Sequence, residues 1–301
     1  MALRYETCMI CGGIGYKKIF TVSDYKHSKE SFDIMECDHC RFRWTDNPPE
    51  EDQIGPYYDN PNYVSHSNTN QGLVFGLYQR VRRIMMNFKS GTIQENSQGK
   101  NLLDVGCGTG HFLNHMKQTS YTVYGIEPAA PAREFCKSNF GIEVHEPSAL
   151  FSDQWNQKMD SITLWHVLEH LYKPDQYLKE FYKKLTSSGV LYIAVPNHQS
   201  TDASYYQNYW TGYDVPRHLW HFGPDHIKQW VESHGFKLIK SKRMSFDAFY
   251  VSILSEQDQK SKLPFIKGML VGCFSFLKSL FDKNKTSSLL YIFKKVEKET
   301  A

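Results

Sequence analysis

The chain has 301 residues, a length that suggests about two domains of ordinary size. Hydrophobic residues make up 41% and charged residues 22% of the sequence, which is the composition of a globular protein and excludes a largely disordered one. The formal net charge of +3 is too small to indicate a dedicated nucleic-acid binder, although it does not exclude binding of nucleic acid.

Four of the seven cysteines stand as two close pairs, Cys8/Cys11 and Cys37/Cys40. An odd number of cysteines excludes complete disulfide pairing within one chain, so metal binding in a reducing compartment fits better. Each C-x-x-C can turn two thiolates toward one ion, and four thiolates favour tetrahedral Zn²⁺ with no open position. We therefore predict a structural zinc ion in a small zinc-ribbon-like module over residues 1–55. A redox C-x-x-C and unpaired core thiols are the alternatives.

A segment rich in Pro, Asp and Asn, residues 45–61, closes this module. Apolar residues then recur at helical spacing from Gly72 to about Lys89, which predicts a linker and a lead-in helix over residues 56–99. The first residues lack the apolar stretch of a signal peptide, and no run of about 18 apolar residues follows. We expect a cytoplasmic protein without a membrane span.

From residue 100 onward, strand and helix signals alternate. Apolar strand patterns fall at 101–106, 122–127, 142–145, 161–166, 189–196 and 236–244, and helical patterns at 111–118, 131–140, 175–185 and 226–235. Such spacing is typical of βαβ units. Residues 246–256 fit either a helix or a strand, and residues 287–295 fit a final antiparallel edge strand. The fold class predicted for residues 100–301 is α/β, a Rossmann-like, doubly wound, mostly parallel seven-stranded sheet.

A glycine-rich turn follows the first of these strands, in the sequence Leu-Leu-Asp-Val-Gly-Cys-Gly-Thr-Gly at 102–110. Glycines permit positive φ and close approach of a ligand, and the helix that begins at once offers unpaired N–H groups. Glu127 ends the next strand, where a carboxylate can bind both hydroxyls of a ribose. The glycines alone would also fit a nicotinamide cofactor or a plain tight turn.

This arrangement resembles the first motif of class I S-adenosylmethionine methyltransferases of the methyltransferase domain 23 type. Glu127-Pro128 is similar to the end of the family's second strand, and Leu-Trp-His-Val-Leu-Glu-His-Leu at 164–171 to its segment after the fourth strand. The resemblance covers roughly residues 100–255. It implies S-adenosylmethionine as cofactor and S-adenosylhomocysteine as product.

The resemblance also implies a set of cofactor-binding residues. These are Asp104, Gly106, Cys107, Gly108, Thr109 and Gly110 for the methionine part, Glu127 and Pro128 for the ribose, Ser148 and Ala149 near the adenine, and Trp165 and His166 beneath the sulfonium. For His166 a purely structural role, such as capping a helix, is the alternative.

The segment 198–223 is unusually rich in Tyr, Trp and His. It follows a strand of the predicted sheet, so we expect it to insert beyond the carboxyl ends of the strands and face the substrate, the alternative being a loop that only covers the sheet. Within it, Arg217 is a candidate for binding an anionic substrate group, and His218 for a general base, with His221 as an alternative base. His166 is the third catalytic candidate.

Zinc module, core and this segment together resemble the nucleotide-sugar C-methyltransferases. In that family a Glu-His pair lies in the equivalent segment, and its histidine is the base. This chain has Arg217-His218 there, so the acidic partner is missing from the pair.

A last apolar helix is predicted over residues 262–285, with lysines along it. We expect it to pack on the core or on a dimer partner, with peripheral contact to a membrane as the alternative.

The predicted function is S-adenosylmethionine-dependent methyl transfer to a small-molecule acceptor such as a sugar, a nucleotide-sugar or a secondary metabolite. An RNA methyltransferase with a zinc-binding recognition module and a non-catalytic binding module are the alternatives. The oligomeric state stays open.

Overall fold

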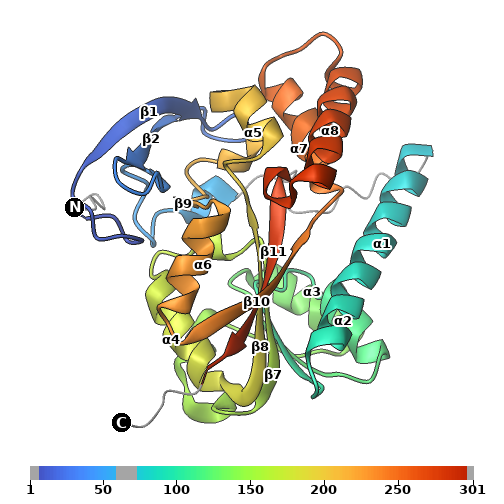
Figure 1. Ribbon diagram of the computed structural model, residues 1–301. Coiled ribbons are helices and arrows are strands. Elements are labelled where there is room, and N and C mark those ends of the chain that lie inside the picture. Colours follow the sequence, from blue (N-terminus) through green and yellow to red (C-terminus); the bar gives the residue numbers. More distant parts are fainter. Residues whose placement is uncertain (1–6, 59–72, 297–301) are drawn as a thin grey trace.

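The computed structural model describes residues 7–58 and 73–296 (Figure 1). Its central sheet has seven strands in the order β10-β11-β8-β7-β4-β5-β6. The strands are β4 (Asn101–Val105), β5 (Thr122–Ile126), β6 (Val144–His145), β7 (Met159–Trp165), β8 (Leu185–Pro196), β10 (Phe236–Arg243) and β11 (Ser288–Lys295). Only β11 runs antiparallel to its neighbours. The predicted fold class, a doubly wound and mostly parallel seven-stranded sheet, is confirmed.

Helices cover both faces of this sheet because alternate residues of its strands point to opposite sides. In β8, Leu191 and Ile193 belong to one core with α4 and α6, whereas Val190 and Tyr192 belong to another with α1 and α2. Figure 1 shows α4 and α6 on one side and α1, α2 and α3 on the other. The bounds are α1 (Leu73–Asn96), α2 (His111–Gln118), α3 (Ala130–Phe140), α4 (Pro174–Lys184) and α6 (Pro224–Glu232).

The carboxyl-terminal part differs from expectation in one respect. The ambiguous segment 246–256 is helical, as α7 (Asp247–Asp258), and the apolar helix is α8 (Pro264–Phe281). The final strand β11 was expected at the edge of the sheet, but it lies between β8 and β10, so that expectation was wrong. The reason is its composition: β11 is apolar on both faces and buried from Ser288 to Phe293, which requires a neighbour and a covering layer on each side.

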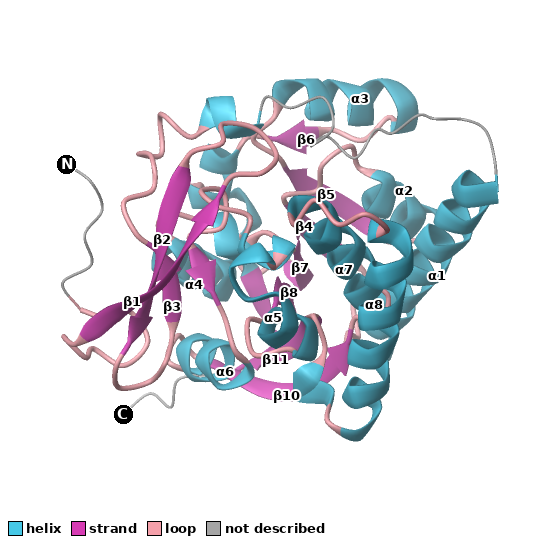
Figure 2. Ribbon diagram, turned by 90° about the horizontal axis from the view of Figure 1, so that it is seen from above, coloured by secondary structure: helices cyan, strands magenta, loops and turns pink. Residues whose placement is uncertain are grey.

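A second sheet of four strands lies beside the first (Figure 2). Three strands come from the N-terminal module, namely β1 (Tyr16–Ser23), β2 (Ser31–Cys37) and β3 (Arg43–Thr45), and the fourth is β9 (Trp220–His221) from the aromatic segment. β3 and β9 pair Arg43 with His221 and Trp44 with Trp220. The module expected over residues 1–55 therefore does not complete its own sheet. The linker and lead-in helix were expected over residues 56–99. The helix is α1, and residues 59–72 of the expected linker lie outside the described residues.

Arg217 joins the same two parts of the chain through a buried ion cluster. Its Nη2 donates to Asp24 Oδ1 and to Asp214 Oδ1, both at 2.9 Å, and its Nη1 donates to the Tyr57 carbonyl at 3.0 Å. Burial alone would raise the pKa of Asp24, but the hydrogen bonds from Arg217 hold it below its usual value. The expectation that Arg217 binds an anionic substrate group is thus corrected, because its donors already serve the chain's own carboxylates.

Replacing Arg217 with Met should strongly destabilise the protein, since Asp24 and Asp214 would stay buried without their shared counter-charge. We predict a loss of about 3–5 kcal/mol in the free energy of unfolding, measured by urea titration. The control is Arg41→Met, whose side chain is 58% exposed and pairs with Glu36, and which should cost less than about 1 kcal/mol. Equal losses of unfolding free energy in the two variants would contradict a structural role of Arg217 in this ion cluster.

Candidate functional site

The glycine loop between β4 and α2 has two glycines that packing requires and one that faces open space. Gly106, Gly108 and Gly110 all have positive φ, of 68°, 54° and 74°. A Cβ on Gly106 would lie 2.5 Å from the Val167 side chain, and one on Gly110 would lie 2.1 Å from Cys136 Sγ. A Cβ on Gly108 would meet nothing within 4 Å. The backbone at Gly108 is therefore open to a ligand.

Two buried carboxylates flank this loop from neighbouring strands. Asp104, at the end of β4, accepts a 2.6 Å hydrogen bond from the Thr163 hydroxyl, and burial raises its pKa to about 7. Glu127 follows β5, and its Oε2 accepts from the Gly108 N–H at 2.9 Å, while its Oε1 accepts from the Ala129 N–H at 3.0 Å. The structure thus brings together most of the predicted cofactor residues on one loop and two strand ends.

The remaining predicted cofactor residues lie at nearby strand ends. Pro128 is exposed directly after Glu127, and Ser148 and Ala149 lie in a 3-10 turn that follows β6. Trp165 ends β7, and the Lys89 ammonium from α1 sits 4.4 Å from the centre of its ring. Burial lowers the pKa of Lys89, while the Asp104 and Asp247 carboxylates oppose that change. The Trp165 ring is thus already in contact with the buried ammonium group of Lys89.

His166 lies between two carboxylates and is held in a left-handed conformation with φ of 59°. Its Nδ1 is 3.4 Å from Glu169 Oε1, and its Nε2 is 3.3 Å from Asp247 Oδ2. Burial alone would lower its pKa, but the bonds to Asp247 and Glu169 outweigh that effect and raise it to about 9. His166 is therefore an imidazolium at neutral pH and not a free base.

His218, in contrast to His166, has a lowered pKa. Its Nδ1 donates to the Gly212 carbonyl at 2.8 Å, so Nε2 carries the lone pair, and burial lowers its pKa. Nε2 lies 4.0 Å from Glu169 Oε1 and 4.0 Å from Asp214 Oδ2. The acidic partner that is absent beside His218 in the sequence is thus supplied through space. The alternative base, His221, lies in β9 with its Nε2 3.1 Å from the Thr45 hydroxyl.

Three histidines, His166, His170 and His218, lie around Glu169. Its side chain is 1% exposed, and its Oε1 forms an ion pair with His166 Nδ1 at 3.4 Å. Neither carboxylate oxygen accepts a hydrogen bond of good geometry from the described residues. A Glu169 oxygen and ring nitrogens of His170 and His218 lie within 4.8 Å of one another. Burial would raise the pKa of Glu169, but His166 and the other histidines keep it below its usual value. A buried carboxylate with unused acceptor capacity can bind a donor group of a substrate.

Sequence reasoning missed Glu169 and Asp247 as members of the site. The signal for Glu169 was present in the Leu-Trp-His-Val-Leu-Glu-His-Leu segment, where it stands three residues after His166, the spacing that one helical turn brings together. Asp247 offered no such signal, because it reaches His166 only through the packing of α7 beyond the sheet.

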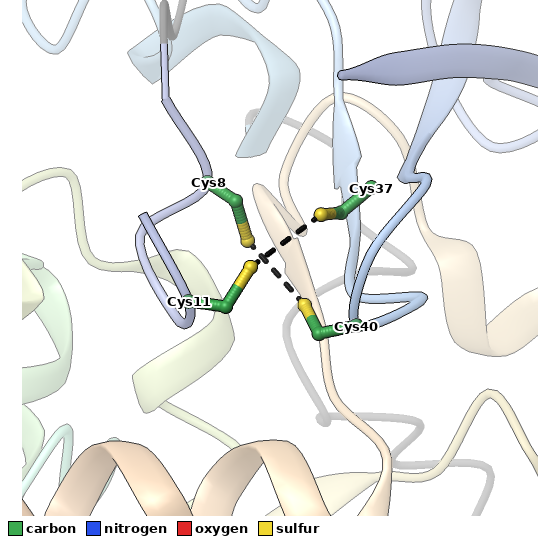
Figure 3. A group of neighbouring side chains, drawn as sticks. All are labelled: Cys8, Cys11, Cys37 and Cys40. Carbon is green, nitrogen blue, oxygen red and sulfur yellow. Dashed lines mark hydrogen bonds between the residues drawn. The ribbon is translucent and has the colours of Figure 1, made fainter. Parts of the chain in front are cut away.

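The four N-terminal cysteines converge on one point (Figure 3). Cys8 Sγ lies 3.5 Å from Cys40 Sγ, and Cys11 Sγ lies 3.6 Å from Cys37 Sγ. These separations are far longer than a disulfide bond of about 2.05 Å. They are close to the separation of about 3.8 Å that Zn–S bonds of about 2.3 Å give in a tetrahedron. The spacing therefore fits an S4 metal site.

We predict that His166 titrates at about pH 9 in the folded protein, as measured by NMR of its ring, and that Asp247→Asn lowers this pKa. Since the folded pKa lies above the ordinary value of about 6.5, the ion pairs of His166 stabilise the protein fully below about pH 6.5. That contribution disappears as the pH rises through about 9. Asp258→Asn, in the same helix but bonded to Thr211, is the control and should leave the titration unchanged. An unaltered pKa in Asp247→Asn would contradict the geometry.

Comparison with known proteins places this chain in a family. The model of a family described as "Methyltransferase domain" matches residues 78–241, more than half of the chain. An uncharacterized methyltransferase of Anoxybacillus flavithermus is 31% identical over 101 residues, which are 33% of this chain and 47% of that protein. A ubiquinone biosynthesis O-methyltransferase of Pseudomonas fluorescens is 28% identical over 108 residues, 34% of this chain and 47% of that protein. The chain thus spans about half the length of these curated relatives.

Among solved structures, the crystal structure of the [4+2]-cyclase SpnF superimposes with a TM-score of 0.50 and 14% identity, covering 70% of this chain and 81% of that one. At this identity the likeness concerns the fold alone. The matched range includes β4, the glycine loop, His166, Glu169 and His218, but not Asp247 or the four N-terminal cysteines. The chain therefore belongs to the methyltransferase domain family.

Proposed function

We propose that the protein transfers a methyl group from S-adenosylmethionine to a hydroxylated small-molecule acceptor, with His218 as the general base. Family membership supports the methyl donor. The residues around the glycine loop fit it, since Gly108 has open space beside its backbone and Glu127 offers a carboxylate directly after β5, where the family resemblance implies the ribose. S-adenosylmethionine supplies an activated methyl group on a sulfonium and leaves as S-adenosylhomocysteine.

The orientation of the His218 ring is the observation that supports its proposed role as general base. Nε2 is the unprotonated ring nitrogen, because Nδ1 is committed to the Gly212 carbonyl. A proton from the acceptor would pass to Nε2, and the imidazolium formed would face the carboxylates of Glu169 and Asp214, each 4.0 Å away. His166 is already charged and cannot take this proton at neutral pH.

The remaining acceptor capacity of Glu169 supports the class of acceptor. Its Oε1 pairs with His166 and lies 4.0 Å from Nε2 of His218, and its Oε2 has no donor from the described part of the chain. Hydroxyl groups of a sugar, a nucleotide-linked sugar or a polyhydroxylated secondary metabolite would supply the missing donors. The same contacts would orient the reacting group, which matters because methyl transfer depends chiefly on alignment and the exclusion of water.

The N-terminal cysteines would hold a structural Zn²⁺. Cys8, Cys11, Cys37 and Cys40 supply four sulfurs at distances that suit the ion. With all positions filled by protein, the ion would stabilise the module and take no part in methyl transfer. The module in turn carries β3, the strand that pairs with β9 close to His218.

Replacing His218 with Ala should reduce turnover by about 10²–10⁴ and leave the affinity for S-adenosylmethionine within about twofold. Turnover is measured as S-adenosylhomocysteine release with an acceptor found in a panel of sugars, nucleotide-sugars and phenols, and affinity by calorimetry. The converse variant is Glu127→Ala, which should weaken cofactor binding about 10-fold or more, because it removes hydrogen bonds to a charged group. Equal loss of both quantities in His218→Ala would refute its role as base. No heat with the cofactor in the wild type would refute the proposed function.

The purified wild-type protein should contain about one zinc ion per chain, measured by elemental mass spectrometry. Cys11→Ser should lose the ion and unfold at a lower temperature, because structural metal binding is coupled to folding. Cys273→Ser, which removes an exposed cysteine far from the cluster in sequence, should retain both the ion and the wild-type stability. The S4 site would be contradicted if Cys11→Ser retained its full zinc content, or if the wild-type protein contained no zinc.

A further inference from the structure

Helix α8 turns its small residues toward the protein and its large apolar residues outward. The buried residues of α8 are Gly268, Gly272, Ser275 and Ser279. The outward side is broad and apolar, and Phe281 at its end is 92% exposed. We call the exposed set the α8 face: Phe265, Ile266, Met269, Leu270, Phe274, Leu277, Leu280 and Phe281.

The inward side is small because α7 and α8 approach closely. A Cβ on Gly268 would lie 2.5 Å from the Ile253 Cα, and one on Gly272 would lie 2.8 Å from the Phe249 Cα. α8 is therefore fixed in its rotation, and the α8 face cannot turn inward without separating the two helices. A contiguous apolar surface of this kind marks a binding site for a partner or a membrane.

The charged residues along α8 and in the segments directly before and after it are almost all positive. Between residues 259 and 285 the sequence has six lysines and a single acidic residue, Asp282. Lys267 and Lys278 stand on α8 itself and are exposed. The other exposed lysines lie just beyond its ends, and they are Lys260, Lys262, Lys283 and Lys285. An apolar face bordered by lysines matches the surface of a bilayer that contains anionic lipids.

Other occupants fit this surface less well. A second copy of the chain placed symmetrically on the α8 face would bring lysine borders against each other, which is unfavourable. The segment 59–72 contains only Tyr63 and Val64 as large apolar residues, so its composition does not match eight large side chains. The bilayer is the occupant that satisfies both the apolar face and its positive border.

We propose that α8 docks the protein on the surface of an anionic membrane, lying in the plane of the interface with the α8 face among the acyl chains and its lysines at the headgroups. α8 is one helix, within the described part of the chain, that is long and apolar enough to cross a membrane by length and composition. Its 18 residues extend about 27 Å, slightly less than a hydrocarbon core of about 30 Å. Its glycine and serine side is also held by α7, which favours the in-plane position. Figure 1 shows α8 at the outside of the molecule with α7 beside it.

The test is co-sedimentation of the full-length protein with vesicles of phosphatidylcholine alone and with vesicles that contain equal amounts of phosphatidylcholine and phosphatidylglycerol. We expect strong binding to the anionic vesicles, weakened by salt, and little binding to the neutral ones. The double variant Lys267→Gln/Lys278→Gln should bind the anionic vesicles about 25-fold less tightly, at about 5-fold per lysine.

The apolar contribution is tested with Leu270→Gln/Phe274→Gln, which should abolish binding and keep the wild-type circular dichroism, because both side chains are exposed. The matched control is Ile14→Gln/Val296→Gln, which changes two exposed apolar residues outside α8 and should bind like the wild type. Absence of binding by the wild type, or unchanged binding by Leu270→Gln/Phe274→Gln, would overturn the proposal. A wild-type dimer that this variant converts to a monomer in sedimentation velocity would overturn it in favour of a dimer interface.

Discussion

The position of His218 depends on the short segment 217–221, which is held in place by hydrogen bonds from two directions. On one side it pairs with β3, and the Thr45 hydroxyl donates to the His218 carbonyl at 2.7 Å. On the other side the Leu219 N–H donates to the Glu169 carbonyl at 2.8 Å. The N-terminal sheet and the turn after β7 are thereby joined through five residues. The N-terminal module with the four cysteines therefore helps to fix the position of His218, although it lies far from the glycine loop in the sequence.

His166 and His218, two of the histidines beside Glu169, differ in charge for a simple electrostatic reason. His166 has carboxylate oxygens at 3.3 and 3.4 Å, one at each ring nitrogen, and these contacts outweigh the cost of burial. For His218 the nearest carboxylates are 4.0 Å away and its Nδ1 donates to a neutral carbonyl, so burial prevails. One buried carboxylate thus lies beside one histidine that is charged at neutral pH and another whose pKa is lowered by burial.

The parallel core could be predicted from the sequence because its signals are local. Each strand there is an apolar run next to a turn, and each helix has its own apolar side, so β4 to β8 and α2 to α4 lie close to the expected ranges. The two-residue strand β9 could not be predicted, since two residues show no alternation. The burial of Arg217 could not be predicted either, because Asp24 is 193 residues away in the chain. The glycine loop and the convergence of the four cysteines could be predicted from spacing, and Glu169 stands at helical spacing from His166. Asp247 approaches His166 only through tertiary packing.

The packing of α7 on α8 links the outer surface of the molecule to its interior. α7 begins at Asp247, whose carboxylate contacts His166 beside the end of β7. The rest of α7 is fixed by the close approach of Gly268 and Gly272, and Ser275 of α8 donates to the buried Asp202 at 2.8 Å. Larger residues at these glycines would push the two helices apart and move Asp247 relative to His166. The small residues of α8 therefore help to hold Asp247 beside His166. Because they occupy the inner side of α8, its large apolar residues lie on the outside, so the position of Asp247 and the exposed apolar face both follow from one helix interface.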